Sequence, residues 1–368
     1  MTKQFMMKAS HINRYAKKKG RGASSNTPNG FDKHHFVPFE EELIDEEQRS
    51  PSTTFLIDTS RTILARNESP DIPFAYSLNP YRGCEHGCIY CYARPSHEYL
   101  GFSAGLDFES KILIKEKAPA LLARELSKKS WEPQVVALSG NTDCYQPIER
   151  KFQLTRKCLE VFLRFRNPVG LITKNALVLR DVDILTAMAE QEIVHVLISI
   201  TSLNQELIRR MEPRTSSPIK RLQAIEVLAK AGIPVGVNIG PIIPGLTDEE
   251  IPRIMQAAAD HGATRAGYIL LRLPGAFKQL FVDWLENNLP ERANKILHSI
   301  QETRNGKLDD SRFGTRMHGE GRVADLIDQL FHAAARKHKL STRWGKLSTD
   351  HFHRETNGQI EIFQEAAN

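Results

Sequence analysis

Three cysteines within eight residues are the part of this sequence best suited to chemistry. Cys84, Cys88 and Cys91 follow a C-x3-C-x2-C spacing on a loop that also contains Gly83 and Gly87. Glycines let the backbone pass close to a bound group, and thiolates at this short spacing can hold a compact [4Fe-4S] cluster. Because that cluster has four irons, three cysteines leave one iron open to bind a further molecule.

Two other interpretations of these cysteines stay open. A structural zinc site would add His86 or His97 as a fourth ligand, although such sites usually combine two distant C-x2-C pairs and this chain has one. The three cysteines could also be unligated core residues. The chain has five cysteines in all, and an odd number with three crowded together argues against a secreted disulfide framework.

Composition bounds the class of protein. The 368 residues can bury a large core. They contain neither an apolar run of about 18 residues nor the apolar block of a secretory signal, so we expect a cytoplasmic protein without membrane association. The net charge of +6 is concentrated in residues 1–21, which carry seven Lys and Arg and no acid. Such an arm could contact nucleic-acid phosphates, or be only a solvated, disordered end.

Three regions follow from the pattern along the chain. Residues 1–50 are predicted to be a disordered basic arm and an acidic linker. Over 51–305, short β-branched runs alternate with amphipathic stretches, which predicts an α/β core of parallel β-α-β units. A helical extension and a tail are expected over 306–368. The expected strands are 135–138, 170–173, 194–200, 234–239 and 268–271, and the expected later helices are 276–287, 291–304 and 321–338.

Polar residues stand at the ends of the first three expected strands. Gly140, Asn141 and Asp143 follow one strand, Lys174 follows the next, and Ser199 closes the third. The carboxyl ends of parallel strands meet at one edge of a sheet, where the functional groups of such folds gather. We therefore expect these side chains to lie close together.

The string from Asn79 to Ala93 reads N-P-Y-x-G-C-x-H-x-C-x-Y-C-Y-A. It resembles the radical S-adenosylmethionine (SAM) superfamily, and within it the branch related to spore photoproduct lyase. The resemblance implies a partial (β/α)6 barrel with the [4Fe-4S] cluster at its open top and SAM bound to the open iron. It further implies that a reducing electron donor of the flavodoxin or ferredoxin type drives cleavage of SAM to a 5′-deoxyadenosyl radical, which abstracts hydrogen from a substrate.

The same resemblance implies roles for three more residues. Tyr90 matches the bulky residue before the third cysteine, whose backbone lies near the adenine of SAM. Lys174 and Ser199 match the polar strand ends that hold the methionine carboxylate, and an ammonium and a hydroxyl suit a carboxylate. The alternative is that both are ordinary polar residues at strand ends.

The segment after the first expected strand carries two further hypotheses. Gly140, Asn141 and Asp143 stand where the family binds the methionine amino group of SAM, but they depart from the commoner Gly-Gly-Glu-Pro. Some relatives use a cysteine near this place as a hydrogen-atom donor, which makes Cys144 a candidate catalytic residue. Its alternative role is packing.

Nucleic acid is the leading hypothesis for the substrate, through the resemblance and the basic arm. The reaction would then be DNA repair or modification of the lyase or oxidoreductase type. One alternative keeps the radical chemistry but acts on a protein or a small metabolite. Another, of a different class, is a zinc-stabilised binding module without catalysis.

The tail from Gln359 to Phe363 resembles the short peptides that bind the bacterial DNA sliding clamp. Ile360 and Ile362 stand where that pattern has Leu. An exposed apolar pair could fill a pocket of the clamp while Gln359 bonds at its rim. Alternatively, the segment forms an edge strand packed on the body of the protein.

Truncation after Asn357 separates these two interpretations of the tail. A docking peptide can be removed without changing the melting temperature, while pull-down by the sliding clamp is lost. Thermal unfolding and pull-down of the intact and shortened chains measure both effects. A lowered melting temperature, with no clamp bound by the intact chain, would show that the tail is structural.

Overall fold

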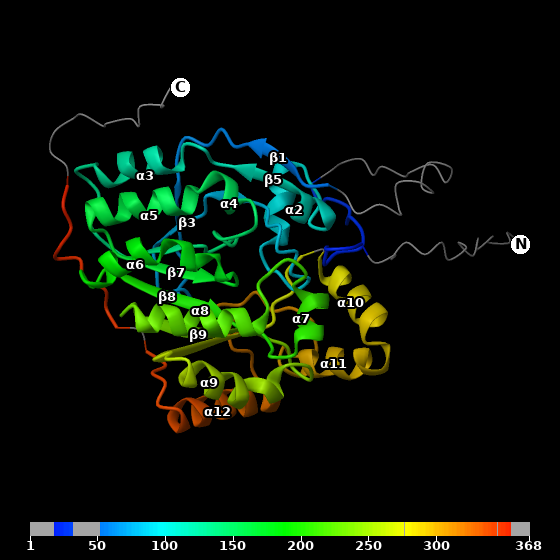
Figure 1. The fold of residues 1–368 in the computed structure, drawn as a ribbon. Helices are drawn as coiled ribbons and strands as arrows, with labels where there is room; N and C mark the ends of the chain where they lie inside the picture. The colour runs from blue at the N-terminus through cyan, green and yellow to red at the C-terminus, as the bar shows by residue number, and fades with distance from the viewer. Residues whose placement is uncertain (1–17, 32–51, 276, 344, 355–368) are drawn as a thin grey trace, which may run out of the picture.

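A parallel sheet forms the centre of the computed structural model of this chain, which describes residues 18–31, 52–275, 277–343 and 345–354. Six neighbouring strands run parallel in chain order, and a seventh strand, β2, pairs antiparallel with β3. This order is that of a partial (β/α)6 barrel, so the predicted fold class is confirmed (Figure 1). The strands are β2 (Leu64–Arg66), β3 (Tyr76–Leu78), β6 (Val136–Leu138), β7 (Val169–Thr173), β8 (Val194–Ser199), β9 (Val235–Ile242) and β10 (Arg265–Leu270).

Amphipathic helices between the strands bury their apolar faces in the main core. On α5, for example, Cys158, Phe162 and Phe165 recur at helical spacing and are fully buried, as expected for one face of a helix on a sheet. The sheet and these helices together make the scaffold that fixes the strand ends (Figure 1). The helices are α3 (Ala118–Leu126), α5 (Leu154–Phe165), α6 (Val182–Ala189), α8 (Pro218–Lys230) and α9 (Ile251–Asp260).

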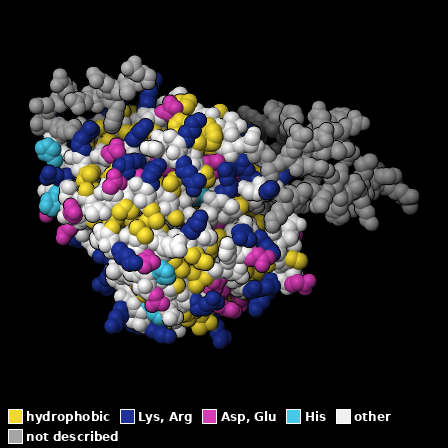
Figure 2. All heavy atoms as spheres, in the orientation of Figure 1, with side chains coloured by type: hydrophobic (Ala, Val, Ile, Leu, Met, Phe, Trp, Pro, Cys, Tyr) yellow, Lys and Arg dark blue, Asp and Glu magenta, His cyan; other side chains and the backbone are white. Residues whose placement is uncertain are grey.

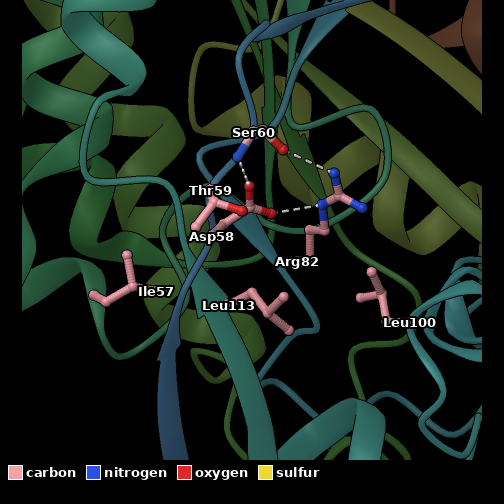
Figure 3. A pocket seen from close by; sticks show the side chains of 7 residues that line it. All are labelled: Ile57, Asp58, Thr59, Ser60, Arg82, Leu100 and Leu113. Carbon is pink, nitrogen blue, oxygen red and sulfur yellow. Dashed lines mark hydrogen bonds and ion pairs between the residues drawn. The ribbon is translucent and has the colours of Figure 1, made fainter.

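A small second sheet, which the sequence did not predict, supports the loop of the three cysteines. Its strands, in the order β1-β5-β4, are β1 (Thr54–Ile57), β5 (Lys111–Ile114) and β4 (Tyr81–Arg82). Figure 3 shows a pocket of about 260 Å³ beside it, lined by Asp58, Ser60 and Arg82 among others. Arg82 Nε lies 2.8 Å from Asp58 Oδ2, so the charge of Arg82 is neutralised and β4 is held where that loop begins.

The C-terminal helices are present where the pattern predicts them. The apolar faces of α10 (Phe277–Asn288) and α11 (Pro290–Glu302) form a second core with α7 (Gln205–Met211) and the cysteine loop. Helix α12 (Arg322–Lys337) packs against α9. Short helical turns complete the fold: η1 (Arg94–Leu100), α2 (Leu106–Ser110), α4 (Glu149–Phe152), η2 (Ala176–Asp181) and η3 (Asp248–Glu250). Within the described ranges, no helix is long and apolar enough to cross a membrane.

Residues 18–31, called the N-terminal strap below, differ from the predicted disordered arm. The backbone N–H groups of Gly22 and Ala23 donate to the carboxylate of Glu109 at 2.9 and 2.8 Å. The prediction of disorder is wrong for the strap. It rested on how few apolar side chains this segment can bury, whereas hydrogen bonds to buried partners fix the segment. The remainder of the predicted arm and linker lies outside the described residues, as does the tail from Gln359 to Phe363.

Candidate active site

The three cysteines lie on one tightly turned loop, residues 83–93, called the cluster loop below. Cys84 and Cys88 are buried and Cys91 is partly exposed, and all three are free thiols. Gly87 adopts a left-handed φ of 66° and donates its N–H to Cys84 O at 3.3 Å, while Cys91 N donates to Cys88 O at 3.2 Å. These successive turns bring the three thiols together on one loop. Burial first, and then neighbouring charges that include Cys84, raise the pKa of Cys88 and Cys91.

The surroundings of the thiols fit a cationic iron cluster. Burial, and then the Cys84 thiol, raise the pKa of Cys91 to about 11. A bound metal centre deprotonates such thiols outright, and its iron ions stabilise the resulting thiolates. Among the described residues, no three His, Cys, Asp or Glu side chains close on one point as ligands of a single ion. A [4Fe-4S] cluster does not require this, because each thiolate binds a separate iron.

A buried arginine holds the cluster loop from inside the protein. Arg94 is fully buried, and its Nε and Nη2 atoms donate to Cys88 O at 3.1 and 2.9 Å. Its Nη1 atom donates to the carbonyls of Ala104 and Gly105. Nη2 also pairs with the buried carboxylate of Glu109. Arg94 therefore fixes the backbone at the second cysteine and is itself neutralised by Glu109.

The N-terminal strap closes over the same loop through Glu109. The carboxylate that pairs with Arg94 also accepts the backbone N–H bonds of Gly22 and Ala23. Gly22 lies so close that a Cβ atom there would stand 1.8 Å from Gly87 O. Only glycine fits at this contact. A continuous chain of contacts thus joins the strap to Glu109, Arg94 and the carbonyl of Cys88.

A second buried network anchors the first turn of the cluster loop. His86 Nδ1 lies 3.4 Å from Asp143 Oδ2, and its Nε2 lies 3.1 Å from Asn175 Nδ2. Burial alone would lower the pKa of His86, but Asp143 and Cys84 raise it to about 10. Burial would likewise raise the pKa of Asp143, yet His86 lowers it to about 2. The pair is therefore ionised, and it ties the loop to the ends of β6 and β7.

The structure shows which groups the Asp143 carboxylate contacts, which the sequence did not reveal. Its carboxylate accepts from Thr173 Oγ1 at 2.7 Å and from the backbone N–H of Lys174 at 2.8 Å, besides facing His86. Gly140 O accepts the hydroxyl of Tyr92, and Asn141 is exposed. The structure thus brings Asp143 and Lys174 together as expected. It gives the Asp143 carboxylate protein partners on both oxygens.

Tyr90 and Lys174 lie together over the cysteines. The Lys174 ammonium stands 5.8 Å from the centroid of the Tyr90 ring and donates to Gly240 O at 3.2 Å. The hydroxyl of Tyr90 donates to Glu212, which forms a buried ion pair with Arg221. Arg221 and Lys174 lower the pKa of Glu212 to about 2, although burial opposes them. Glu212 and Arg221 therefore support Tyr90 from behind.

Ser199 and Cys144 are both buried. Ser199 ends β8, beside the end of β7, and its Oγ lies 3.5 Å from Asn238 Nδ2. Cys144 is fully buried in the main core, and its carbonyl accepts from Thr155 Oγ1 at 2.6 Å. Burial raises the pKa of the Cys144 thiol well above its usual value. This position favours packing, and hydrogen donation by Cys144 stays a prediction.

Sequence reasoning missed Arg94, Glu109 and Gly22 as residues of this site. Gly22 lies between Arg21 and Ala23 in a glycine-rich segment. Such a segment indicates that the backbone passes close to another part of the protein. Nothing local marks Glu109, since its partners at the strap lie 86 and 87 positions away in sequence.

Comparison with known proteins places this site in a family. The model of the radical SAM superfamily matches residues 78–258. An uncharacterized protein of Mycobacterium tuberculosis strain H37Rv is 36% identical over 236 residues, which cover 63% of this chain and 69% of that protein. An uncharacterized protein of Methanocaldococcus jannaschii is 33% identical over 175 residues, covering 48% of this chain and 63% of that protein.

Solved structures with the same fold include spore photoproduct lyases. The lyase complexed with dinucleoside spore photoproduct has a TM-score of 0.57 at 17% identity, over 85% of this chain and 87% of that one. A point mutant of spore photoproduct lyase has a TM-score of 0.56 at the same identity and with the same coverage. At this identity, the similarity shows a shared fold.

The strap contact yields a prediction about the iron cluster. Gly22→Ala places a methyl group against Gly87 O and should lift the strap from the cluster loop. Overpacking of this kind costs about 1–3 kcal/mol, so we expect iron to be lost to a chelator about tenfold faster. Bleaching of the cluster absorbance measures this rate.

Gly30→Ala is the matched control, because the nearest atom to a Cβ there is 3.9 Å away. It should lose iron at the wild-type rate. Equal iron retention by Gly22→Ala and Gly30→Ala would show that the strap does not hold the loop.

Proposed function

Because this chain belongs to the radical SAM superfamily, we propose that it is a radical SAM enzyme whose substrate is nucleic acid. One observation at the cluster loop carries the choice of substrate. Tyr92, directly after the third cysteine, keeps 46% of its surface exposed, and the guanidinium of Arg272 stands 5.6 Å from its ring centroid. An exposed aromatic ring beside a cation is the arrangement by which proteins bind single-stranded nucleic acid.

Two further findings support this choice. The spore photoproduct lyase of similar fold is complexed with dinucleoside spore photoproduct. The chain is basic, with an isoelectric point near 9.0, and phosphates attract basic proteins. Figure 2 shows Lys and Arg scattered among acidic and apolar side chains on the face in view. Since that face carries no broad basic patch, we assign the specific contacts to the active site.

The residues that hold the cofactors can be named. Cys84, Cys88 and Cys91 bind the [4Fe-4S] cluster, and one iron is left for SAM. Bound there, the reduced cluster and SAM supply the 5′-deoxyadenosyl radical that abstracts hydrogen from the substrate. An electron donor must reduce the cluster, and we propose a flavodoxin or ferredoxin. The chain itself orients SAM and keeps water from the reacting atoms.

We assign the methionine part of SAM to the ends of β6, β7 and β8. Lys174 gives one of its three ammonium N–H bonds to Gly240 O within the described protein, which leaves donors for a carboxylate. Ser199 at the neighbouring strand end is the second donor. The backbone around Gly140 and Asn141 would receive the amino group. Asp143, whose oxygens are already engaged, would position these elements.

Two alternatives of the same chemistry are a protein substrate and a small metabolite. Such a substrate would need a carboxylate or phosphate of its own to pair with Arg272, whereas every linkage of a nucleic acid carries a phosphodiester. Repair by a lyase reaction and oxidative modification would differ in their products. Docking of the tail from Gln359 on a DNA sliding clamp would further support action on DNA.

Removal of the Lys174 ammonium should weaken SAM binding and leave the cluster intact. A charge-assisted hydrogen bond contributes about 1.5–3 kcal/mol, so Lys174→Ala should bind SAM about ten- to a hundredfold more weakly. Equilibrium dialysis measures the affinity, and iron analysis checks the cluster. Lys220→Ala, at an exposed position on α8, should match the wild type. Equal SAM affinity in both variants would remove Lys174 from the site.

Transfer of deuterium tests the proposed substrate class directly. The reduced protein is given SAM with deuterated DNA, RNA, peptides or metabolites, and 5′-deoxyadenosine is analysed by mass spectrometry. We expect deuterium in 5′-deoxyadenosine only from nucleic acid, and no 5′-deoxyadenosine from Cys91→Ala, which cannot hold the cluster. Deuterium arriving only from peptides or metabolites would refute the nucleic-acid substrate.

A further inference from the structure

Arg272 lies at the edge of the sheet where the cluster loop and the strand ends meet. It follows β10 by two residues. Its guanidinium stands over Tyr92 of the cluster loop, and the hydroxyl of Tyr92 donates to Gly140 O just after β6. Tyr92 thus spans from the end of β6 to the end of β10. Arg272 is placed at the opening between these two strand ends.

The guanidinium of Arg272 lacks an anionic partner among the described residues. Its Nε atom is buried without an acceptor. The hydrogen bond that the guanidinium does make runs from Nη1 to Met317 Sδ at 3.8 Å, and a thioether is a weak acceptor. Since a guanidinium carries five N–H donors, most of its hydrogen-bonding capacity stays unused. A partly buried cation in this condition is costly unless an anion joins it.

Other arginines of this site show what a structural role looks like. Arg94 is matched by Glu109 and three carbonyls, and Arg221 by Glu212. Arg316, near Arg272, pairs with Asp71 Oδ2 at 2.7 Å. Arg94 and Arg316 also lie over aromatic rings, those of Phe108 and Phe313, so Arg272 differs from all three in lacking an anionic partner among the described residues. Stacking fixes the plane of a guanidinium and leaves its N–H edge free for a bidentate ligand.

The charge around Arg272 favours a ligand of high negative charge density. Burial and the neighbouring Arg316 both lower the pKa of Arg272, and Asp309 and Asp71 offset this only in part. Arg316 is itself paired with Asp71, so the charge at this opening that no anionic side chain pairs with, among the described residues, is that of Arg272. Phosphate accepts two parallel hydrogen bonds from a guanidinium. Lys174, rather than Arg272, is among the charges that lower the pKa of Cys88 and Cys91. We therefore assign Lys174 to SAM and Arg272 to the substrate.

We propose that Arg272 is a substrate-binding residue that takes a phosphate of the nucleic acid at the opening of the active site. This inference rests on the proposed function and deepens it. The bidentate contact fixes one phosphodiester against Tyr92, and so sets which sugar or base reaches the cluster. Binding of SAM does not involve Arg272.

The test measures binding of fluorescently labelled single-stranded DNA to the cluster-loaded full chain as a function of salt. Arg272→Gln should bind about tenfold or more weakly, and the slope of log affinity against log salt should fall by about one phosphate contact. Arg336→Gln is the matched control. Arg336 is exposed in the last turn of α12; the chain after this helix pairs with Arg265, at the opposite end of β10. The Arg336→Gln variant should bind the labelled DNA with nearly the affinity of the wild type.

A second arm replaces the charged DNA by an uncharged one and compares the wild type with Arg272→Gln. A DNA with neutral methylphosphonate linkages should bind the wild type and Arg272→Gln equally. Iron content and melting temperature confirm that the variant is intact. SAM affinity of Arg272→Gln should equal that of the wild type.

The outcomes separate this inference from the proposed function. If the wild type shows no salt-dependent binding of nucleic acid, the proposed function and the role of Arg272 both fall. If it binds, and Arg272→Gln and Arg336→Gln lose affinity equally, only the role of Arg272 is overturned. Loss of SAM affinity with unchanged DNA binding would assign Arg272 to SAM and also overturn the inference.

Discussion

The buried ion pair between Arg94 and Glu109 holds together the segments that form the cluster loop. Arg94 binds the carbonyl of Cys88, and Glu109 binds the backbone of Gly22 and Ala23 in the strap. Both side chains are fully buried, and breaking such a pair from one side costs about 3–5 kcal/mol. Neither residue needs to touch a cofactor. Their contacts fix the backbone from which the three thiols project.

Two kinds of charged residue meet at the strand ends, and their partners distinguish them. Asp143 with His86 and Glu212 with Arg221 are closed pairs, whose charges are satisfied inside the protein. They hold the cluster loop and Tyr90 in place. Lys174 and Arg272 instead keep N–H donors that have no anionic partner among the described residues. A site that binds the carboxylate of SAM and an anionic substrate needs both kinds, because rigid support and open cations are separate requirements.

The sequence predicted those parts of the molecule that depend on local pattern. The spacing of Cys84, Cys88 and Cys91 led to the iron–sulfur cluster, and the alternation of strands with helices led to the parallel α/β core. The partial barrel and SAM were implied by the resemblance of the string from Asn79 to Ala93 to a known family. The first parallel strand, β3, was not predicted, because it is short and lacks the continuous apolar run that marks β6, a strand of the same length. The strap was predicted to be disordered, since its order depends on Glu109, far away in the chain. The unpaired state of Arg272 likewise appears only once its neighbours are known.

The most direct test of the account is a Mössbauer spectrum of the anaerobically purified, iron-57-enriched protein, taken with and without SAM. A [4Fe-4S] cluster held by Cys84, Cys88 and Cys91 predicts that one iron in four changes its signal when SAM is added, because only that iron lacks a thiolate. A protein that contains stoichiometric zinc instead of iron would contradict the account. A cluster in which the Mössbauer signals of all four irons stay unchanged when SAM is added would also contradict it.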